Sequence, residues 1–176
     1  MKYFLPLLCL LLMGFPAQSQ TVAASPAIHA YFSPSGGCTD AVVTALNAAQ
    51  KRVLVQAYSF TSAPIAKALV GAKKRGVDVQ VILDKSQRTE RYSSASFLAD
   101  EGISTLIDPV HKIAHNKVMI IDGSTLITGS FNFTKAAEEG NAENLLVISN
   151  DPELASIYTI NWKKHLGHSE KYLARH

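Results

Sequence analysis

Residues 115–134 constrain the fold more than any other stretch of the chain. Two short apolar runs, 118–121 and 126–128, are joined there by Asp122 and Gly123. An Asp-Gly pair between such runs is a strong signal for a β-hairpin, because glycine accepts the positive φ that a tight turn requires. The chain is therefore expected to contain two antiparallel strands here, with its other elements arranged around them.

The same hairpin brings polar side chains together. Alternate residues of a strand share a face, so His115 and Lys117 are expected to point the same way. Ser130 and Asn132 follow the second strand with the same spacing. These four residues supply an imidazole, an ammonium, a hydroxyl and a carboxamide. The set contains a candidate nucleophile and hydrogen-bond donors for an oxyanion, but no obvious cage of metal ligands.

The N-terminal segment is predicted to be a signal peptide that covers residues 1–19. It has a positive start, an apolar run too short to span a membrane comfortably, and a small-x-small cleavage site that ends at Ser19. Residues 20–26 are expected to form a flexible lead-in. Residues 27–176 are then expected to form one domain of ordinary size, exported to the periplasm or secreted.

Charge and cysteine content limit the function only weakly. The formal net charge is +3, and it falls by one when Lys2 leaves with the leader. That mild excess does not by itself indicate a polyanionic partner. Only Cys38 remains after cleavage, so no disulfide can form within the chain. No later segment is apolar enough to span a membrane, and no stable membrane anchor is expected.

Strand and helix patterns alternate in the first half of the domain, and strands dominate the second half. Besides the hairpin, strands are predicted at 28–32, 52–58, 77–83, 103–107 and 144–149. Helices are predicted at about 39–51, 62–76, 93–100 and 151–166, with a helical turn or loop at 135–140. This order predicts an α/β fold in which a mixed β-sheet is flanked by helices on both faces.

The polar residues of the hairpin form a specific pattern: His115-x-Lys117, then Asp122, then Gly129-Ser130-x-Asn132. Each fixed position is matched by chance about one time in twenty, so the whole pattern carries information. It resembles the signature of the phospholipase D superfamily, present here in one copy. Residues 57–62, 73–77 and 129–137 also resemble the small secreted Nuc-type endonucleases of that superfamily. The likeness covers nearly the whole mature chain and implies their sandwich fold.

The resemblance implies a covalent phosphohistidine on His115, which water then hydrolyses. A neutral imidazole is a fair nucleophile at about pH 7. Lys117 is expected to neutralise phosphate oxygens as charge builds in the transition state, while Ser130 and Asn132 line the phosphate site. The Nuc-type group has a glutamate at the position of Glu143. We expect this residue to orient the imidazole by bonding its second ring nitrogen.

Two further positions of the pattern are expected to have structural roles. Asp122 falls at the hairpin turn, five residues beyond Lys117, and should not share the face of His115. Aspartate is favoured at such turns because its side chain bonds nearby backbone groups. Gly129 is likewise assigned to the scaffold of the pattern.

A single copy of the pattern leaves the reaction without a proton donor for the leaving oxygen. A second histidine can supply that proton, and no other histidine of the chain lies in a comparable sequence context. A two-fold dimer places His115 and its mate on opposite sides of one phosphate. The chain is therefore expected to be a homodimer with one composite active site.

No metal or cofactor is expected. His111 and His115 have the spacing of a zinc pair on a helix, but the apolar β-branched context indicates a strand, and no third ligand is expected near them. Cleavage is therefore expected to persist in chelator, although zinc can still inhibit by binding the paired histidines.

The basic residues best placed to contact a nucleic-acid backbone are Arg88, Arg91 and Lys112, which lie in segments expected to border the site. No base-reading motif is present, so binding should tolerate many sequences. The predicted function is a metal-independent phosphodiesterase that cleaves DNA, or RNA, with little sequence preference.

Two alternatives remain open. A phospholipase D or cardiolipin-type lipid hydrolase shares the same chemistry, although the chain shows no amphipathic membrane helix. A non-catalytic nucleic-acid-binding protein of the same fold is the second alternative. The intact His115, Lys117 and Asn132 argue against it.

Overall fold

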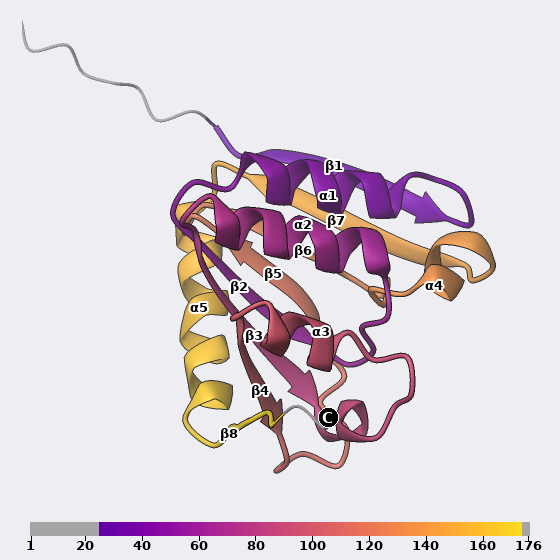
Figure 1. The fold of residues 1–176 in the computed structure, drawn as a ribbon. Helices are drawn as coiled ribbons and strands as arrows, with labels where there is room; N and C mark the ends of the chain where they lie inside the picture. The colour runs from indigo at the N-terminus through magenta and orange to yellow at the C-terminus, as the bar shows by residue number, and fades with distance from the viewer. Residues whose placement is uncertain (1–24, 174–176) are drawn as a thin grey trace, which may run out of the picture.

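The computed structural model describes residues 25–173, so the predicted signal peptide and most of the lead-in lie outside the described residues. The described chain forms one eight-stranded sheet (Figure 1). The strands, in their order across the sheet, are β1 (Ala27–Ser33), β7 (Glu143–Ser149), β6 (Thr125–Gly129), β5 (Lys117–Ile121), β2 (Arg52–Ala57), β3 (Asp78–Asp84), β4 (Ser104–Asp108) and β8 (Glu170–Lys171).

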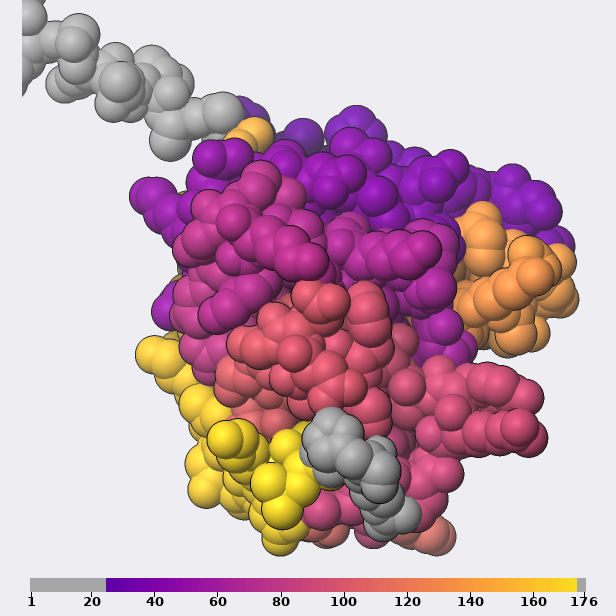
Figure 2. Space-filling model, in the orientation of Figure 1, coloured from indigo at the N-terminus to yellow at the C-terminus, as the bar shows by residue number. Residues whose placement is uncertain are grey.

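The helices that connect these strands lie on both faces of the sheet. They are α1 (Cys38–Ala48), α2 (Ala63–Lys74), the 3-10 helix η1 (Lys85–Arg88), α3 (Ala95–Asp100), α4 (Lys135–Glu139) and α5 (Pro152–Leu166). In Figure 1, α1, α2 and α3 lie in front of the sheet and α5 lies on its other side. The space-filling view shows side chains of the first three helices covering the front face (Figure 2). The predicted fold class is confirmed.

The sheet is mixed because its connections are of two kinds. β2, β3 and β4 are parallel, and the crossover segments between them contain α2 and α3. β5, β6, β7 and β1 pair antiparallel, and β5 pairs antiparallel with β2 in the middle of the sheet. β5 is buried along its whole length, and its sequence after Lys117 is accordingly a continuous apolar run rather than an alternating pattern.

Each face of the sheet has its own apolar core. On β5, Met119 and Ile121 join the larger core beneath α1 and α2, while Val118 and Ile120 join the smaller core beneath α5. This alternation follows from the two-residue period of a strand. Trp162 of α5 closes the smaller core, where its indole N–H donates a 2.9 Å hydrogen bond to the carbonyl of Val55.

The structure differs from the predicted elements at a few places. Helix α1 begins at Cys38, because Gly37 adopts a φ of 79° and serves as its N-cap. Cys38 is completely buried, and burial, with the nearby charges of Glu138 and Glu143, raises the pKa of its thiol to about 11. The thiol is therefore a core group with little thiolate character. Strand β8 was not predicted, since two residues carry no periodic signal.

The strand directions bring the ends of seven strands to one side of the molecule. β2, β3 and β4 end there, at Ala57, Asp84 and Asp108. Because β5 runs the other way, its first residue, Lys117, pairs with Ala57. Gly129 at the end of β6 pairs with Leu145 near the start of β7, and β1 also ends on this side. We call this side the motif end of the sheet.

Asp122 lies at the opposite end, in the turn between β5 and β6. Its φ is 53°, and its carboxylate accepts hydrogen bonds from the backbone N–H groups of Gln50, Lys51 and Arg52 at 2.8, 2.8 and 2.9 Å. Burial by itself would raise the pKa of Asp122, but these hydrogen bonds and the charge of Lys51 hold it below its ordinary value. The carboxylate thus ties the hairpin turn to the start of β2.

Replacing that carboxylate should weaken the fold. Asp122→Ala leaves three backbone N–H groups without their acceptor, and we expect the free energy of unfolding to fall by about 1–3 kcal/mol. The folded-state pKa is lowered, so the stabilisation is present above the unfolded-state pKa of about 4 and is lost as pH falls through the folded-state value. Urea unfolding of both proteins at neutral and acid pH measures the difference.

Asp100→Asn is the control, because it removes the same charge from an exposed carboxylate that makes no hydrogen bond in the described chain. Equal unfolding midpoints for Asp122→Ala and Asp100→Asn would contradict the structural role of Asp122.

Candidate active site

His115 and Lys117 lie side by side where the chain enters β5. Lys117 is only 6% exposed, and its Nζ donates a 2.9 Å hydrogen bond to the carbonyl oxygen of His115. The same Nζ lies 5.2 Å from the ring centroid of Tyr58, whose ring is 4.7 Å from that of His115. The imidazole of His115 is exposed and makes no hydrogen bond within residues 25–173. The buried ammonium and the exposed histidine thus lie close together, each near the ring of Tyr58.

Tyr58 is a site residue to which the sequence analysis assigned no role. It immediately follows β2, and its backbone N–H donates a 2.8 Å hydrogen bond to the carbonyl of Asn116. That bond holds the end of β2 beside the segment that carries His115. The sequence offered only a local signal, a polar aromatic residue directly after a buried strand, and the pairing that places this strand beside β5 is known from the structure.

The ammonium of Lys117 has unused N–H donors that can bind an anion. Burial lowers the pKa of Lys117, and the negative charge of Glu143 opposes that shift. A protonated lysine has three donors, and one of them is used by His115. A cation held in a poorly solvated position gains stabilisation when an anion approaches, because the charge is then paired.

Glu143 occupies the start of β7 at the motif end. Its Oε1 accepts a 3.1 Å hydrogen bond from the side-chain amide of Asn141, and in the described part of the chain it makes no hydrogen bond to His115. Its charge nevertheless acts on Lys117. The structure therefore places Glu143 near the site without the contact that an orienting role requires.

Gly129 and Ser130 bring the end of β6 against β7. Gly129 has a φ of 146°, and a Cβ atom there would lie 2.2 Å from the carbonyl oxygen of Asn144, so no other residue fits. The N–H of Ser130 donates to that carbonyl at 3.0 Å, and the Ser130 hydroxyl accepts from the N–H of Asn144 at 3.0 Å. The hydroxyl proton stays available for a ligand.

Asn132 sits between Phe131 and Phe133, which are both completely buried and hold this turn in place. The N–H groups of Thr61 and Ser62 bond the carbonyl of Phe133 at 3.0 and 2.9 Å. Asn132 Oδ1 is buried and has no hydrogen-bond partner among the described residues. An unpartnered buried acceptor costs about 1–3 kcal/mol, and such exceptions are typical of functional sites.

The three basic candidates lie in segments that follow β3 and β4 at the motif end. Arg88 in η1 forms an ion pair with Glu170 of β8, so its guanidinium is partly occupied. Arg91 is exposed, with its guanidinium 5.5 Å from the ring centroid of Tyr92. Lys112 is exposed in the segment between β4 and β5. Arg91 and Lys112 are the more accessible cations.

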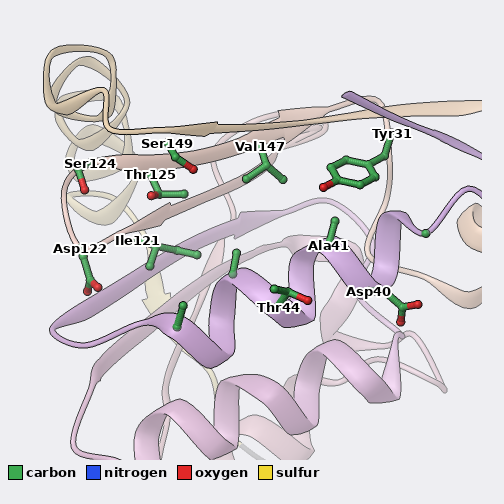
Figure 3. Close-up of a pocket in the computed structure, with 13 residues that line it drawn as sticks. Tyr31, Asp40, Ala41, Thr44, Ile121, Asp122, Ser124, Thr125, Val147 and Ser149 are labelled. Atoms are coloured by element: carbon green, nitrogen blue, oxygen red, sulfur yellow. The ribbon is translucent and has the colours of Figure 1, made fainter. Parts of the chain in front are cut away.

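A hollow of about 590 Å³ lies between α1 and the strands, where Tyr31 and Val147 face Ala41 and Thr44 (Figure 3). Its lining includes neither His115 nor Lys117.

Among the described residues, no helix combines the length and apolar character needed to cross a membrane.

The expectation that no third metal ligand lies near His111 is wrong. Its ring does not pair with His115 but gathers with Asp108, His165 and His168. Burial alone would raise the pKa of Asp108, but contacts with the three histidines and the N–H of Val110 hold it well below its usual range. The ligands were missed because His165, in α5, and His168, just beyond its end, lie more than fifty residues from His111 along the chain.

Comparison with known proteins gives consistent results. Residues 42–165 match the family model described as "Cardiolipin synthase, PLD-like domain". A phospholipase D of Rickettsia conorii is 44% identical over 131 residues, which cover 74% of this chain and 65% of the relative. A mitochondrial cardiolipin hydrolase of Danio rerio is 36% identical over 100 residues, 55% of this chain and 43% of the relative. The chain thus spans at most about 65% of the length of these two relatives.

A solved structure extends the likeness to the fold. Nuc from Salmonella typhimurium, described as a phospholipase D family member, has a TM-score of 0.82 and 41% sequence identity. The matched region covers 84% of this chain and 99% of that one.

The buried ammonium of Lys117 predicts that the protein binds inorganic phosphate. We expect inorganic phosphate to raise the melting temperature of the protein, and Lys117→Met to remove that increase. Without phosphate, Lys117→Met should be as stable as the parent or more stable by about 1 kcal/mol, because a poorly solvated charge is replaced by an apolar side chain of similar length. Differential scanning calorimetry with and without phosphate measures both effects.

Lys67→Met is the matched control, since Lys67 is an exposed lysine of α2. A phosphate-induced increase that survives in Lys117→Met and is lost in Lys67→Met would show that the anion binds elsewhere.

Proposed function

The chain belongs to the phospholipase D superfamily, and we propose that it is an exported phosphodiesterase that cleaves DNA or RNA with little sequence preference. The observation that carries this proposal is that the buried ammonium of Lys117 bonds the backbone carbonyl of the exposed His115, while both side chains lie against the ring of Tyr58. Ser130 and Asn132 supply further polar groups at the ends of the adjoining strands. The set suits a phosphate diester, whose two non-bridging oxygens share one negative charge and need donors while the phosphorus is attacked.

In the proposed reaction, a ring nitrogen of His115 attacks the phosphorus and forms a P–N bond as the P–O bond to the leaving group breaks. The leaving oxygen takes a proton from an acid on the opposite side. Water then attacks the phosphohistidine, gives its proton to the same group, and releases the phosphomonoester and the free imidazole. Lys117, Ser130 and Asn132 stabilise the negative charge that builds on the phosphate oxygens in both steps.

The acid of this scheme is His115 of a second copy of the chain. Within residues 25–173, His111, His165 and His168 all face Asp108, and His29 lies on the edge strand β1. None of them makes a ring contact with His115, whose aromatic neighbour in the described chain is Tyr58. A homodimer with one composite site supplies the missing group with the residue already present.

Exposed apolar side chains at the motif end support such a dimer. Val110 and Ile113 are 63% and 51% exposed in the segment that carries His115. Phe32 of β1 is 66% exposed and pairs in register with Asn144, the partner of Ser130. Apolar surface of this kind contributes about 25 cal/mol per Å² when it is buried. An interface there would bring two copies of His115 towards each other.

Glu143 is proposed to fix the imidazole tautomer once the dimer has formed. Its position at the start of β7 and its electrostatic effect on Lys117 support a role at this site. In this role its carboxylate accepts a hydrogen bond from the ring nitrogen of His115 that does not attack phosphorus.

Lipid hydrolysis is the second candidate function. The sequence relatives are described as phospholipase D and cardiolipin hydrolase, and the same residues would attack a lipid phosphodiester. His115 is exposed and does not line the hollow of Figure 3, which favours a long polymer that lies across the motif end.

A single assay compares the candidates. Purified protein in excess chelator, kept well below its melting temperature, should cleave plasmid DNA or RNA and should leave phospholipid vesicles intact. His115→Asn should lower turnover by a factor of about 10⁴ or more, because the nucleophile itself is removed. His29→Asn should retain full activity, since His29 is exposed on β1.

Lipid turnover without nucleic-acid cleavage would overturn the nuclease assignment. Nucleic-acid binding without any cleavage would instead identify a non-catalytic binding protein. An active monomer in sedimentation experiments would contradict the composite site.

A further inference from the structure

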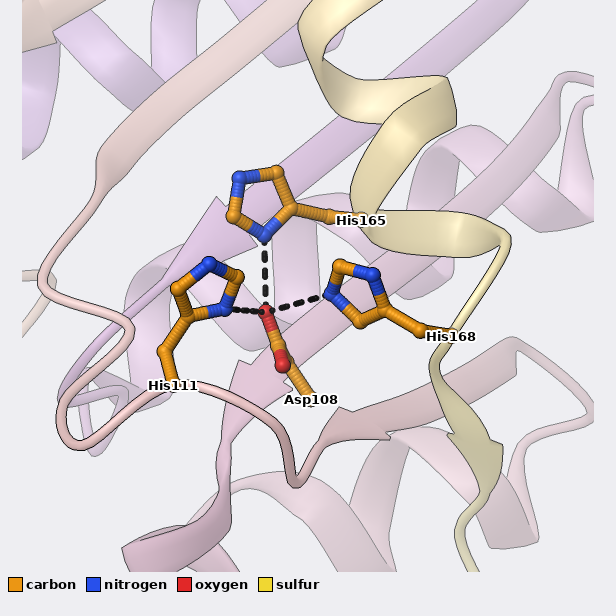
Figure 4. A group of neighbouring side chains, drawn as sticks. All are labelled: Asp108, His111, His165 and His168. Carbon is orange, nitrogen blue, oxygen red and sulfur yellow. Dashed lines mark hydrogen bonds and ion pairs between the residues drawn. The ribbon is translucent and has the colours of Figure 1, made fainter.

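Four metal-ligating side chains meet at the β4 side of the motif end. Asp108 is the last residue of β4, and His111 follows in the segment that leads to β5. His165 lies in the last turn of α5, and His168 lies just beyond its end. Figure 4 shows the three imidazoles directed at the carboxylate from three sides. The four ligand atoms all lie within 4.8 Å of one another.

The three imidazole nitrogens converge on a single oxygen. From Asp108 Oδ2, Nδ1 of His165 lies at 2.7 Å, Nδ1 of His111 at 2.9 Å and Nε2 of His168 at 3.3 Å. The other carboxylate oxygen already accepts a 3.1 Å hydrogen bond from the N–H of Val110. The carboxylate is completely buried, so water does not share these contacts.

One of the three histidines, His168, makes no hydrogen bond to the carboxylate in this arrangement. His168 Nε2 is buried and has no hydrogen-bond partner in the described part of the chain, because its contact with Asp108 lacks hydrogen-bond geometry. A buried polar atom without a partner calls for a ligand or another explanation. A metal ion at the centre of the four side chains would coordinate this nitrogen together with the other two.

We propose that Asp108, His111, His165 and His168 bind one Zn²⁺ ion. Imidazole nitrogen and carboxylate oxygen are both zinc ligands, and four protein ligands complete the tetrahedral shell of a structural zinc site. With metal–ligand bonds of about 2.1 Å, the edge of that tetrahedron is about 3.4 Å. The nitrogen–oxygen separations of 2.7 to 3.3 Å are already near this length, and the ligand atoms, which lie within 4.8 Å of one another, would draw closer around the ion.

The proposed site is accessible from solvent, and two of its ligands are held by packed elements. His111 has a side chain that is 44% exposed, whereas that of His165 is 13% exposed, so the ion enters from the His111 side. Asp108 and His165 are held by β4 and α5, which both pack against the core. Imidazole-rich sites favour zinc, copper or nickel over magnesium or calcium.

The proposed ion has a structural consequence for the candidate active site. It would join the end of α5 to the segment between β4 and β5, and that segment carries His115 four residues beyond His111. The same segment is otherwise tied to β3 by a 2.7 Å hydrogen bond from the N–H of Ala114 to Asp84. The zinc would therefore restrict the motion of the segment that precedes β5, and it would do so without contacting the phosphate. Because its ligands exclude His115, zinc binding does not depend on the proposed reaction.

Metal titration of the full purified chain, stripped with chelator and dialysed, tests the proposal. We expect one Zn²⁺ per chain by elemental analysis at neutral pH. At a hundredfold excess over the dissociation constant, the melting temperature should rise by about 5–10 °C. Co²⁺ in place of zinc should give the strong visible absorption of a tetrahedral site, and zinc should displace it.

Substitutions locate the ion. His168→Asn and His111→Asn should weaken zinc binding at least about tenfold, the loss expected even when only a supporting residue is removed. His111 is the most exposed of the three histidines, so His111→Asn is the variant least prone to unfold. His29→Asn should bind zinc like the parent protein, and so should His115→Asn even where it abolishes cleavage.

Absence of Co²⁺ absorption and of a zinc-induced rise in melting temperature would overturn the proposal. Zinc binding that is unchanged in His111→Asn and His168→Asn, or lost in His115→Asn, would also overturn it. Failure of nucleic-acid cleavage in a protein that binds zinc as described would count only against the proposed function.

Discussion

The antiparallel pairing of β5 with β2 is the constraint on which the candidate site depends. β2, β3 and β4 are parallel and end on the same side of the molecule. A strand that ran with them would begin at the far side. Because β5 runs against them, Lys117 pairs with Ala57 and the chain enters β5 where the parallel strands end. His115, Tyr58 and the end of β6 meet there for the same reason.

The hairpin serves different purposes at its two ends. At the turn, Asp122 satisfies three backbone N–H groups and anchors β5 to the start of β2. At the open end, Gly129 lets β6 approach the backbone of β7, and the groups left there are poorly satisfied. Lys117 is buried, and Asn132 Oδ1 is without a partner in the described chain. The turn end of the hairpin is thus held by satisfied hydrogen bonds, and the motif end carries the buried ammonium that can bind an anion.

Local patterns in the sequence predicted most of the fold. The Asp-Gly turn, the helical periodicities and the alternation of strands and helices were enough for the mixed sheet and its two helical layers. The failures have physical reasons. Strand β8 has two residues, too few for a pattern. Tyr58 and the set formed by Asp108 with His165 depend on which strand ends are neighbours, and no spacing along the chain encodes that arrangement.

His115 is proposed as the nucleophile of a composite site, and trapping the covalent intermediate tests this role. A substrate with a radiolabelled phosphodiester, quenched in alkali during turnover, should leave label on the protein as an alkali-stable and acid-labile adduct. Peptide mapping should place the label on His115, at no more than one per two chains, because the mate serves as the acid. Label on another residue, or label on both copies of His115 in one dimer, would contradict the account.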